Sequence, residues 1–368
     1  MILIIAILIF SCTDQLSAQN FNNCSIISLT SGDTVVMGRN HDSNISNCLI
    51  VFNPCGINKE GFEFPGENTP KWTSKYASIA FNVLGVGFAV LGMNEEGLSI
   101  GHMGFSEAKY PAKDDRMVID QIQFITYILD NCASTTEVIE KLDEIRISDE
   151  SYTREHYFAC DKTGKFAVIE FINGELVLNT NETMPYPLVS NDNYDKSIAY
   201  LKNYSGFGGE KPIPERTFGV EEVMVIGCTR LNEYQKRKNG DIVESAFSIL
   251  HDIGFNKFPP PDTVDVNPNY GTQFTAIFDL KNLEIFYKTK SNSSIRKIDF
   301  DFFNSSCSSG LKFLEIENTE KGNVNNLFTD YSLEKNLSYL IRWNNSSRTL
   351  SKDVIDFLSQ YPESFKCE

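Results

Sequence analysis

The chain has 368 residues, with 33 Lys and Arg against 49 Asp and Glu, so its net charge is −16. This excess of acidic residues argues against a nucleic-acid-binding protein, because such proteins bind phosphates through clustered basic side chains. Hydrophobic residues make up 41% of the chain and aromatic residues 12%, which excludes a disordered polymer and indicates an ordered globular protein.

The first 23 residues are expected to precede the folded domain. Residues 2–10 form an unbroken apolar run, far shorter than the roughly 20 residues that span a bilayer. Small and polar residues follow as far as Ala18, a pattern typical of a secretory signal peptide. We therefore expect an exported protein, whether secreted, periplasmic or lysosomal. Cleavage after Ala18 would leave a short propeptide and cleavage after Asn23 would not, while a lipid anchor at Cys12 is an alternative.

The next segment has the alternating pattern of β-strands. Residues 24–30 and 34–38 flank the turn sequence Ser31-Gly32-Asp33, which predicts a β-hairpin. Two helices are expected after further strands: one carries apolar residues at helical spacing from Val118 to Leu129, and Ser134 begins a capping box ahead of the other. The remaining strands are expected at 48–52, 76–83, 86–93, 98–103, 156–160, 166–172, 175–178, 273–278, 283–288 and 297–302, and the remaining helices at 194–202, 230–237 and 241–250.

The order of these elements favours an α+β fold. Tight hairpins connect many of the strands, which is typical of antiparallel sheets. Two sheets packed face to face, each covered outside by helices, would use every predicted element. We expect one domain over residues 24–311 and a polar extension over 312–368, which ends in a helix capped by Ser351 and is interpreted as an appendage.

Cysteine and histidine patterns give no sign of a metal site or a cofactor. The chain has nine cysteines, and Cys48 and Cys55 are close enough for a small disulfide loop, but the cysteines show no regular spacing. The four histidines lie far apart in sequence, with no paired metal-ligand motif. None of them is in an obvious catalytic setting.

A short match to the esterase nucleophile elbow is interpreted as a coincidence. Gly97-Leu98-Ser99-Ile100-Gly101 fits G-x-S-x-G, but the elbow requires a strand that turns into a helix. Here the pattern continues as a strand beyond Ser99, so we expect an ordinary strand serine.

Cys24 is the strongest candidate nucleophile. It begins the first predicted strand, a few residues after a plausible cleavage site. If processing makes it the first residue, its free α-amino group, with an unperturbed pKa of about 7.7 to 8.0, would lie beside its own thiol and could act as the base. A half-buried strand cysteine with no chemical role is the alternative.

The residues of the partner strand support this interpretation. Arg39 and Asp42 come at the end of the second strand of the hairpin that starts with Cys24. In an antiparallel pair the end of the second strand lies beside the start of the first, so both side chains are expected near the sulfur. An ordinary surface ion pair is the alternative.

The chain resembles the choloylglycine hydrolase family of N-terminal-nucleophile (Ntn) hydrolases, which includes bile salt hydrolases and penicillin V acylases. The resemblance spans about residues 24–302, with every matching stretch in the family's order. These stretches are Cys24 with Gly38-Arg39-Asn40-His41-Asp42, Met93 to Phe105, Ser134 to Leu142, His156 to Asp161 with Thr163-Gly164-Lys165, Leu188-Val189-Ser190-Asn191, and Thr272-Gln273-Phe274-Thr275.

The resemblance implies a four-layer αββα Ntn-hydrolase sandwich and a role for each matching residue. Cys24 would be the nucleophile, Asp42 would hold its α-amino group, and Arg39 would lower the pKa of the thiol. Asn191 would stabilise the oxyanion with its side-chain amide.

Two further assignments are less direct: one residue differs from the family, and the other has an alternative in this chain. Gly104 stands where the family has Asn or Tyr, so it would offer only its backbone N–H to the oxyanion. Arg230 would be the second catalytic arginine, with Arg216 as a rival.

The function implied is hydrolysis of a linear, non-peptide amide bond in an N-acyl substrate, such as a conjugated bile salt or penicillin V, through an acyl-thioester and without a cofactor. A fatty-acid amide, of the N-acylethanolamine or acyl-homoserine lactone type, is an alternative substrate. A secreted binding protein that keeps the fold without turnover is an alternative of another class. The expected partner is the small-molecule substrate, and self-association into a homo-oligomer is left open.

Overall fold

The computed structural model describes residues 24–151, 153–217, 219–237, 240–255, 270–347 and 350–367. The predicted signal peptide, its two cleavage sites and Cys12 lie outside these residues.

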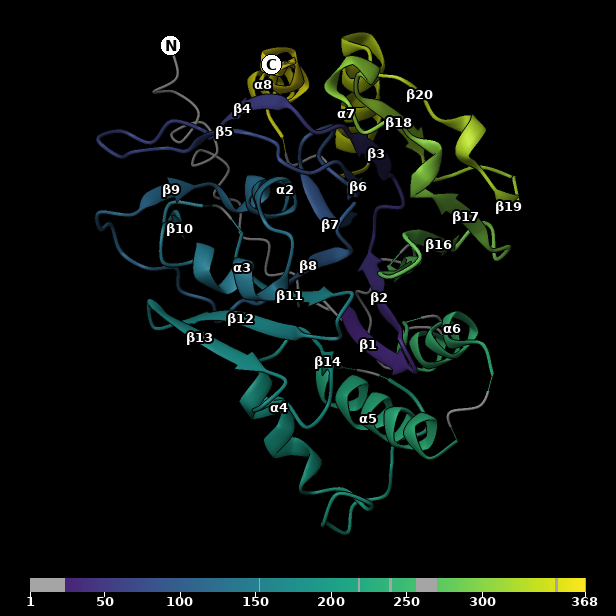
Figure 1. Cartoon of the computed structure of the whole chain (residues 1–368). Helices are drawn as coiled ribbons and strands as arrows, with labels where there is room; N and C mark the ends of the chain where they lie inside the picture. Colours follow the sequence, from purple (N-terminus) through teal and green to yellow (C-terminus); the bar gives the residue numbers. More distant parts are fainter. Residues whose placement is uncertain are drawn as a thin grey trace.

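Two large, almost entirely antiparallel sheets form the centre of the molecule (Figure 1). The seven-stranded sheet runs in the order β14 (Leu188–Val189), β1 (Ser25–Ser31), β2 (Thr34–Ser43), β15 (Gly271–Asp279), β16 (Glu284–Thr289), β17 (Arg296–Asp299) and β19 (Gly322–Asn323). The nine-stranded sheet runs in the order β13 (Glu175–Thr180), β12 (Phe166–Ile172), β11 (Glu155–Asp161), β8 (Leu98–Gly104), β7 (Ala89–Asn94), β6 (Ser78–Asn82), β3 (Leu49–Asn53), β18 (Lys312–Glu315) and β20 (Thr329–Asp330). Within these two sheets, β19 alone pairs in the parallel sense, with β17.

The main hydrophobic core lies between the two sheets. Alternate residues of each strand point into it, for example Ile26 and Met37 from the seven-stranded sheet and Phe81 and Phe158 from the nine-stranded sheet. This alternation is the period-2 pattern from which the strands were predicted.

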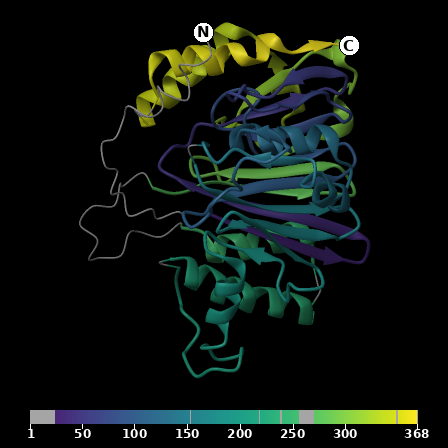
Figure 2. The ribbon, with the colours of Figure 1, turned by 90° about the vertical axis from the view of Figure 1, so that its left-hand side faces the viewer.

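Helices cover the outer face of each sheet, which completes the four-layer αββα arrangement (Figure 2). The helices on the seven-stranded sheet are α4 (Tyr194–Leu201), α5 (Val220–Arg237) and α6 (Ile242–Ile253), and those on the nine-stranded sheet are α2 (Gln121–Asn131) and α3 (Thr135–Lys141). Helix α6 approaches β2 closely, because a Cβ atom at Gly38 would lie 2.7 Å from Leu250 Cδ1. A larger residue at this position would therefore displace the Leu250 side chain, where the strand that carries Arg39 meets its covering helix.

Most local predictions are confirmed, including the first hairpin and the Ser134 cap, whose hydroxyl accepts from Glu137 N–H. The helix predicted from Val118 is an exception at its start. Residues Met117–Ile119 form β9, which pairs in parallel with β10 (Ile145–Ile147), and α2 begins only after Asp120, which caps it. Apolar residues of this short strand happen to continue the helical spacing of α2.

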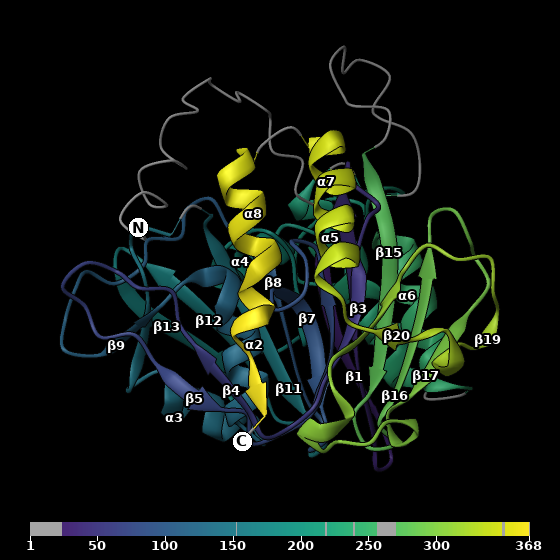
Figure 3. The ribbon, with the colours of Figure 1, turned by 90° about the horizontal axis from the view of Figure 1, so that it is seen from above.

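The C-terminal residues are part of the central structure, contrary to the appendage expected for 312–368. Strand β18 pairs with β3 and β19 pairs with β17, so each large sheet has a strand from this segment. Helices α7 (Leu333–Ser347) and α8 (Lys352–Gln360) lie side by side and cover the β3 end of the nine-stranded sheet (Figure 3). The polar composition that suggested an appendage belongs to the solvent-facing sides of these helices.

A disulfide fixes the end of the chain. It joins Cys307 to Cys367, whereas Cys48 and Cys55, which are close enough in sequence for a small disulfide loop, are both free. Cys307 opens a short 3₁₀ helix (Cys307–Ser309), and Cys367 lies in β21 (Lys366–Cys367) of a small sheet with β4 (Ile57–Glu60) and β5 (Lys71–Thr73). Cys48 is buried in the core between the sheets, and Cys55 packs against the same core. Further 3₁₀ turns lie at Phe300–Phe302, Asn325–Leu327 and Tyr361–Ser364.

Leu340 provides a test of this integration. Its side chain is fully buried between α7 and β3, so Leu340→Ala is expected to lower the free energy of unfolding by about 2 to 5 kcal/mol. The neighbouring Ile341 is 45% exposed, and Ile341→Ala is expected to change stability by less than about 0.5 kcal/mol. Urea denaturation of both variants measures the difference, and equal stabilities would show that α7 does not belong to the core.

Candidate active site

Strand order brings the predicted site residues together at the start of β1. Cys24 immediately precedes this strand, which lies between β14 and β2. The pairing of Ile26 with Val189, continued by two residues, puts Cys24 opposite Asn191. The pairing of Ser25 with Asn40, continued by one residue, puts Cys24 opposite His41. Residues far apart in sequence therefore meet because three neighbouring strands have a fixed register.

Cys24 is held against the backbone of β2. Its sulfur accepts a hydrogen bond from the backbone N–H of Asp42 at 3.4 Å and lies 3.7 Å from the carbonyl oxygen of the same residue. The residue is only 6% exposed. The hairpin thus brings the backbone of Asp42 to the cysteine, while the predicted role of its side chain stays a prediction.

Arg39 is a buried cation that connects the two sheets beside the cysteine. Its Nη1 donates to the carbonyl oxygen of Val90 in β7 at 2.6 Å, and its Nη2 lies 3.3 Å from Nδ1 of His41. The residue is 1% exposed. The guanidinium is therefore fixed in place by both sheets.

In the described structure, the pKa of the Cys24 thiol is raised above its usual value. Burial is the main cause, and the nearby Asp42 also raises it, while Arg39 lowers it by its charge and by a hydrogen bond. Arg39 thus acts in the expected direction, but burial outweighs it. A thiolate at this position needs a further favourable contribution, such as a proton acceptor beside the sulfur.

The Asp42 carboxylate is buried without a well-aligned hydrogen bond to either oxygen among the described residues. Burial raises its pKa from 3.8 to about 7, although the Thr272 side chain on β15 and the charge of Arg39 both lower it. Among the described residues, Arg39 is the cation that acts on this carboxylate, and it does so without a direct ion pair. A positively charged group beside it would stabilise the ionised form.

Asp42 makes the stability of the unprocessed chain pH-dependent. Its pKa is about 7 in the folded chain and near 3.8 when unfolded, so between these values the folded state binds more protons. The contribution of Asp42 to the free energy of unfolding should therefore be most favourable below about pH 4. The free energy of unfolding should then fall by roughly 4 kcal/mol as the pH rises from 4 through 7. Asp42→Asn is expected to remove this slope in urea unfolding, measured from pH 4 to 8 on chains whose mass shows that residues before Cys24 are retained.

The matched control for this experiment is Asp33→Asn, because the Asp33 side chain is 91% exposed. This variant should keep the wild-type slope. An unchanged slope in Asp42→Asn would contradict the assignment.

His41 is a site residue that sequence reasoning missed. Its ring stacks on Phe274, with centroids 4.7 Å apart, and its Nδ1 faces Arg39. Burial, with the charges of Arg39 and His102, holds its pKa well below its usual value, so the ring is neutral at neutral pH. The hairpin register, which puts residue 41 opposite residue 24, is the signal that could have identified it.

Asn191 and Gly104 also lie together. The side-chain Nδ2 of Asn191 donates to the carbonyl oxygen of Gly104 at 2.7 Å. Gly104 is the last residue of β8, and Asn191 lies two residues after β14. An amide nitrogen has two protons, so this bond leaves one for a second acceptor. The two residues predicted to stabilise an oxyanion are therefore neighbours, and the strand register puts Asn191 opposite Cys24.

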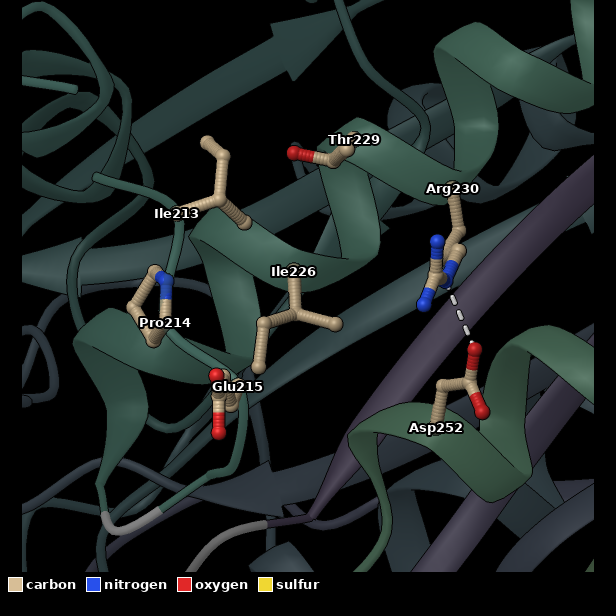
Figure 4. A pocket seen from close by; sticks show the side chains of 7 residues that line it. All are labelled: Ile213, Pro214, Glu215, Ile226, Thr229, Arg230 and Asp252. Atoms are coloured by element: carbon tan, nitrogen blue, oxygen red, sulfur yellow. Dashed lines mark hydrogen bonds and ion pairs between the residues drawn. The ribbon is translucent and has the colours of Figure 1, made fainter. Parts of the chain in front are cut away.

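The structure does not bring Arg230 into this cluster. The residue lies on α5, where its Nε donates to Asp252 at 2.6 Å (Figure 4). Its Nη1 donates to Glu233 at 3.1 Å. It lines a cavity of about 420 Å³ with residues of α6 and of the loop before α5, on the outer side of the seven-stranded sheet. Its rival Arg216 is an exposed residue of that loop. The second arginine thus stays a prediction.

The esterase-like motif is a strand, as expected. Ser99 lies within β8, is fully buried, and donates to the carbonyl oxygen of Gly92 at 2.8 Å. Within the described ranges, no group of three or more His, Cys, Asp or Glu side chains could hold a metal ion. No helix in those ranges is long and apolar enough to cross a membrane.

Two antiparallel sheets between helical layers, with the cluster at the start of β1, define an Ntn-hydrolase fold. The family model of the linear amide C–N hydrolases, choloylglycine hydrolase family, matches residues 24–228. The chain belongs to this family and is a hydrolase that acts on linear amide C–N bonds.

Solved structures of low sequence identity share the fold. Penicillin V acylase from Agrobacterium tumefaciens matches with a TM-score of 0.70 and 22% identity, over 84% of this chain and 98% of that one. A variant of conjugated bile acid hydrolase from Clostridium perfringens matches with a TM-score of 0.67 and 22% identity, over 80% and 98% of the two chains. A second mutant of that hydrolase has a TM-score of 0.65 and 21% identity, over 82% and 99%. A comparison with curated proteins found no match.

Proposed function

We propose that the protein is a cysteine Ntn hydrolase that cleaves an N-acyl amide after residues 1–23 are removed. The Cys24 thiolate attacks the amide carbonyl carbon, the C–N bond breaks, and the amine leaves with a proton. Water then attacks the acyl-thioester, releasing the acid and restoring the thiol. The observation that carries this proposal is that Cys24, Asp42, Arg39 and Asn191 converge at the start of one strand.

Processing would supply the base that the site otherwise lacks. Removal of residue 23 converts the Cys24 backbone nitrogen into a free amine, with an unperturbed pKa of about 7.7 to 8.0. This amine would lie beside the buried Asp42 carboxylate, and its protonated form would provide that carboxylate with a cation. Arg39 would favour the thiolate, as it already does against the effect of burial.

Asn191 and Gly104 would stabilise the oxyanion of the tetrahedral intermediate. The second proton of Asn191 Nδ2 and the backbone N–H of Gly104 are the proposed donors. Gly104 has no side chain to contact the substrate, so selectivity would come from other walls of the site. Arg230 is retained as the proposed second arginine, with Arg216 as its rival.

The proposed substrate is a conjugated bile salt or a penicillin V-like compound, supported by the family match and by the two kinds of structural relative. A fatty-acid amide is the alternative substrate. Export through the predicted signal peptide is also part of the proposal.

Two measurements on the purified protein test this function. N-terminal sequencing should show a mature chain that begins at Cys24, and a chain that retains Gln19 would contradict the proposed base. Release of phenoxyacetate from penicillin V, of bile acid from its glycine conjugate and of fatty acid from an N-acylethanolamine identifies the acyl group. No release from any of the three would contradict the proposed substrate classes.

A further inference from the structure

A buried pair, His156 and Glu170, lies behind both proposed oxyanion donors. The pairing of Tyr157 with Ile169 places the two residues opposite each other on β11 and β12. Nδ1 of His156 lies 3.1 Å from Oε1 of Glu170, and both side chains have no exposed area. Their nearest strand neighbours on the same face, Phe158 and Val168, belong to the core between the sheets.

Glu170 holds the turn that follows Asn191. Its Oε1 accepts from the backbone N–H of Tyr194 at 3.0 Å, and its Oε2 accepts from Nδ2 of Asn193 at 2.9 Å. Two oxygens of one buried carboxylate therefore fix two successive residues, two and three positions after Asn191. A carboxylate is suited to this because it accepts several hydrogen bonds and donates none.

His156 contacts the strand that contributes the other donor. Its ring stacks on Phe105, with centroids 5.0 Å apart, and Phe105 directly follows Gly104. The backbone N–H of Phe105 donates to the carbonyl oxygen of Arg154, which fixes the end of β8. The pair thus touches the residue after Gly104 on one side and the turn after Asn191 on the other.

This arrangement is costly for a purely structural purpose. Burying an ionisable pair in an apolar core costs desolvation free energy that an apolar pair of similar volume would avoid. Nε2 of His156 adds to the cost, since it is buried without a hydrogen-bond partner in the described part of the chain. The contacts of the pair lead instead to the two groups that must be placed accurately for oxyanion stabilisation.

We infer that Glu170, oriented by His156, is a positioning residue that sets the distance between the Asn191 side-chain amide and the Gly104 N–H. The inference rests on the proposed function, because it assigns a role through the oxyanion site. Glu170 touches neither the substrate nor Cys24 in this role. Its effect reaches the reaction only through Asn191.

The test is a double-mutant cycle between Glu170 and Asn191. Glu170→Gln keeps the shape of the side chain and one acceptor oxygen. Its NH₂ group, which cannot accept a hydrogen bond, then faces either the donor amide of Asn193 or the donor N–H of Tyr194. It is expected to lower kcat by about 100-fold with KM changed less than threefold, the scale expected for a misplacement of about 1 Å. In an Asn191→Ala background, Glu170→Gln should lower kcat by less than threefold further, because the group on which it acts is absent. Additive losses would overturn the inference.

Two controls separate misfolding from misplacement. Asn193→Ser removes the donor to Glu170 while its hydroxyl can still cap α4, as Asn193 now does for the Lys196 N–H, so it should fold normally and lower kcat by about 10-fold. Glu175→Gln on the exposed start of β13 should leave kcat unchanged. If Glu170→Gln does not fold, Asn193→Ser in the same cycle decides the matter, and wild-type kcat in that variant would overturn the inference.

Failure of the proposed function gives a different result. If Cys24→Ala hydrolyses as fast as wild type, the cysteine mechanism is wrong, and with it the premise of this inference. If Cys24→Ala and Asn191→Ala both lose activity while the cycle is additive, only the role of Glu170 is wrong.

Discussion

Cys24→Ala is expected to lower kcat by about 10⁶-fold, the scale on which loss of a covalent nucleophile acts in other hydrolases. The sulfur is the only thiol of the described chain that lies beside both Arg39 and Asp42. Other free thiols, such as those of Cys132 and Cys228, are buried within cores on the helical sides of the sheets. Product release under saturating substrate measures the effect, with mass spectrometry to confirm the mature N-terminus of the wild type.

The matched control for this experiment is Cys132→Ala. Cys132 is the fully buried C-cap residue of α2, on the outer face of the nine-stranded sheet. Its loss should reduce stability by about 1 kcal/mol and leave kcat of the folded protein unchanged. Retention of more than a tenth of wild-type kcat by Cys24→Ala would refute the proposed nucleophile.

Asn191→Ala is expected to lower kcat by about 100- to 1,000-fold with little change in KM, the usual cost of removing one oxyanion donor. The reason is that its Nδ2, already oriented by the Gly104 carbonyl at 2.7 Å, has one proton left for the developing negative charge. The effect should appear in kcat because the interaction forms in the transition state.

Asn181→Ala is the matched control, because it removes an asparagine amide that makes a similar hydrogen bond away from the site. Asn181 Nδ2 also donates to a glycine carbonyl, that of Gly164, at 2.9 Å, but the contact is exposed and lies in a turn region of β12 and β13. This variant should keep wild-type kcat. A loss of less than threefold in Asn191→Ala would exclude the residue from the oxyanion site.

Predictions from sequence succeeded where local patterns decide the structure. The first hairpin follows from strand alternation and a Ser-Gly-Asp turn, and this was sufficient to bring Asp42 to Cys24. The Ser134 helix start follows from a capping box, whose hydrogen bonds are within a few residues. The strand interpretation of Ser99 was likewise a local inference.

Other features depend on contacts that no local pattern encodes. Strand β14 has two residues, too few for a periodic signal, yet its pairing with β1 is what puts Asn191 opposite Cys24. The disulfide between Cys307 and Cys367 joins residues 60 apart, and the irregular cysteine spacing gave no indication of this pairing. Arg230 was predicted in a region without a clear pattern, and the helix expected at 230–237 is only the last part of α5.

The interlocking of the C-terminal segment with both sheets bears on the order of events during biosynthesis. Strands β18 and β19 are synthesised after the strands with which they pair, and until they dock, β3 and β17 each present an unpaired backbone edge that can promote aggregation. A nascent chain that has not yet exposed residues 312–323 therefore leaves both sheets open at these edges. We expect trimming in front of Cys24 to follow the docking of both strands.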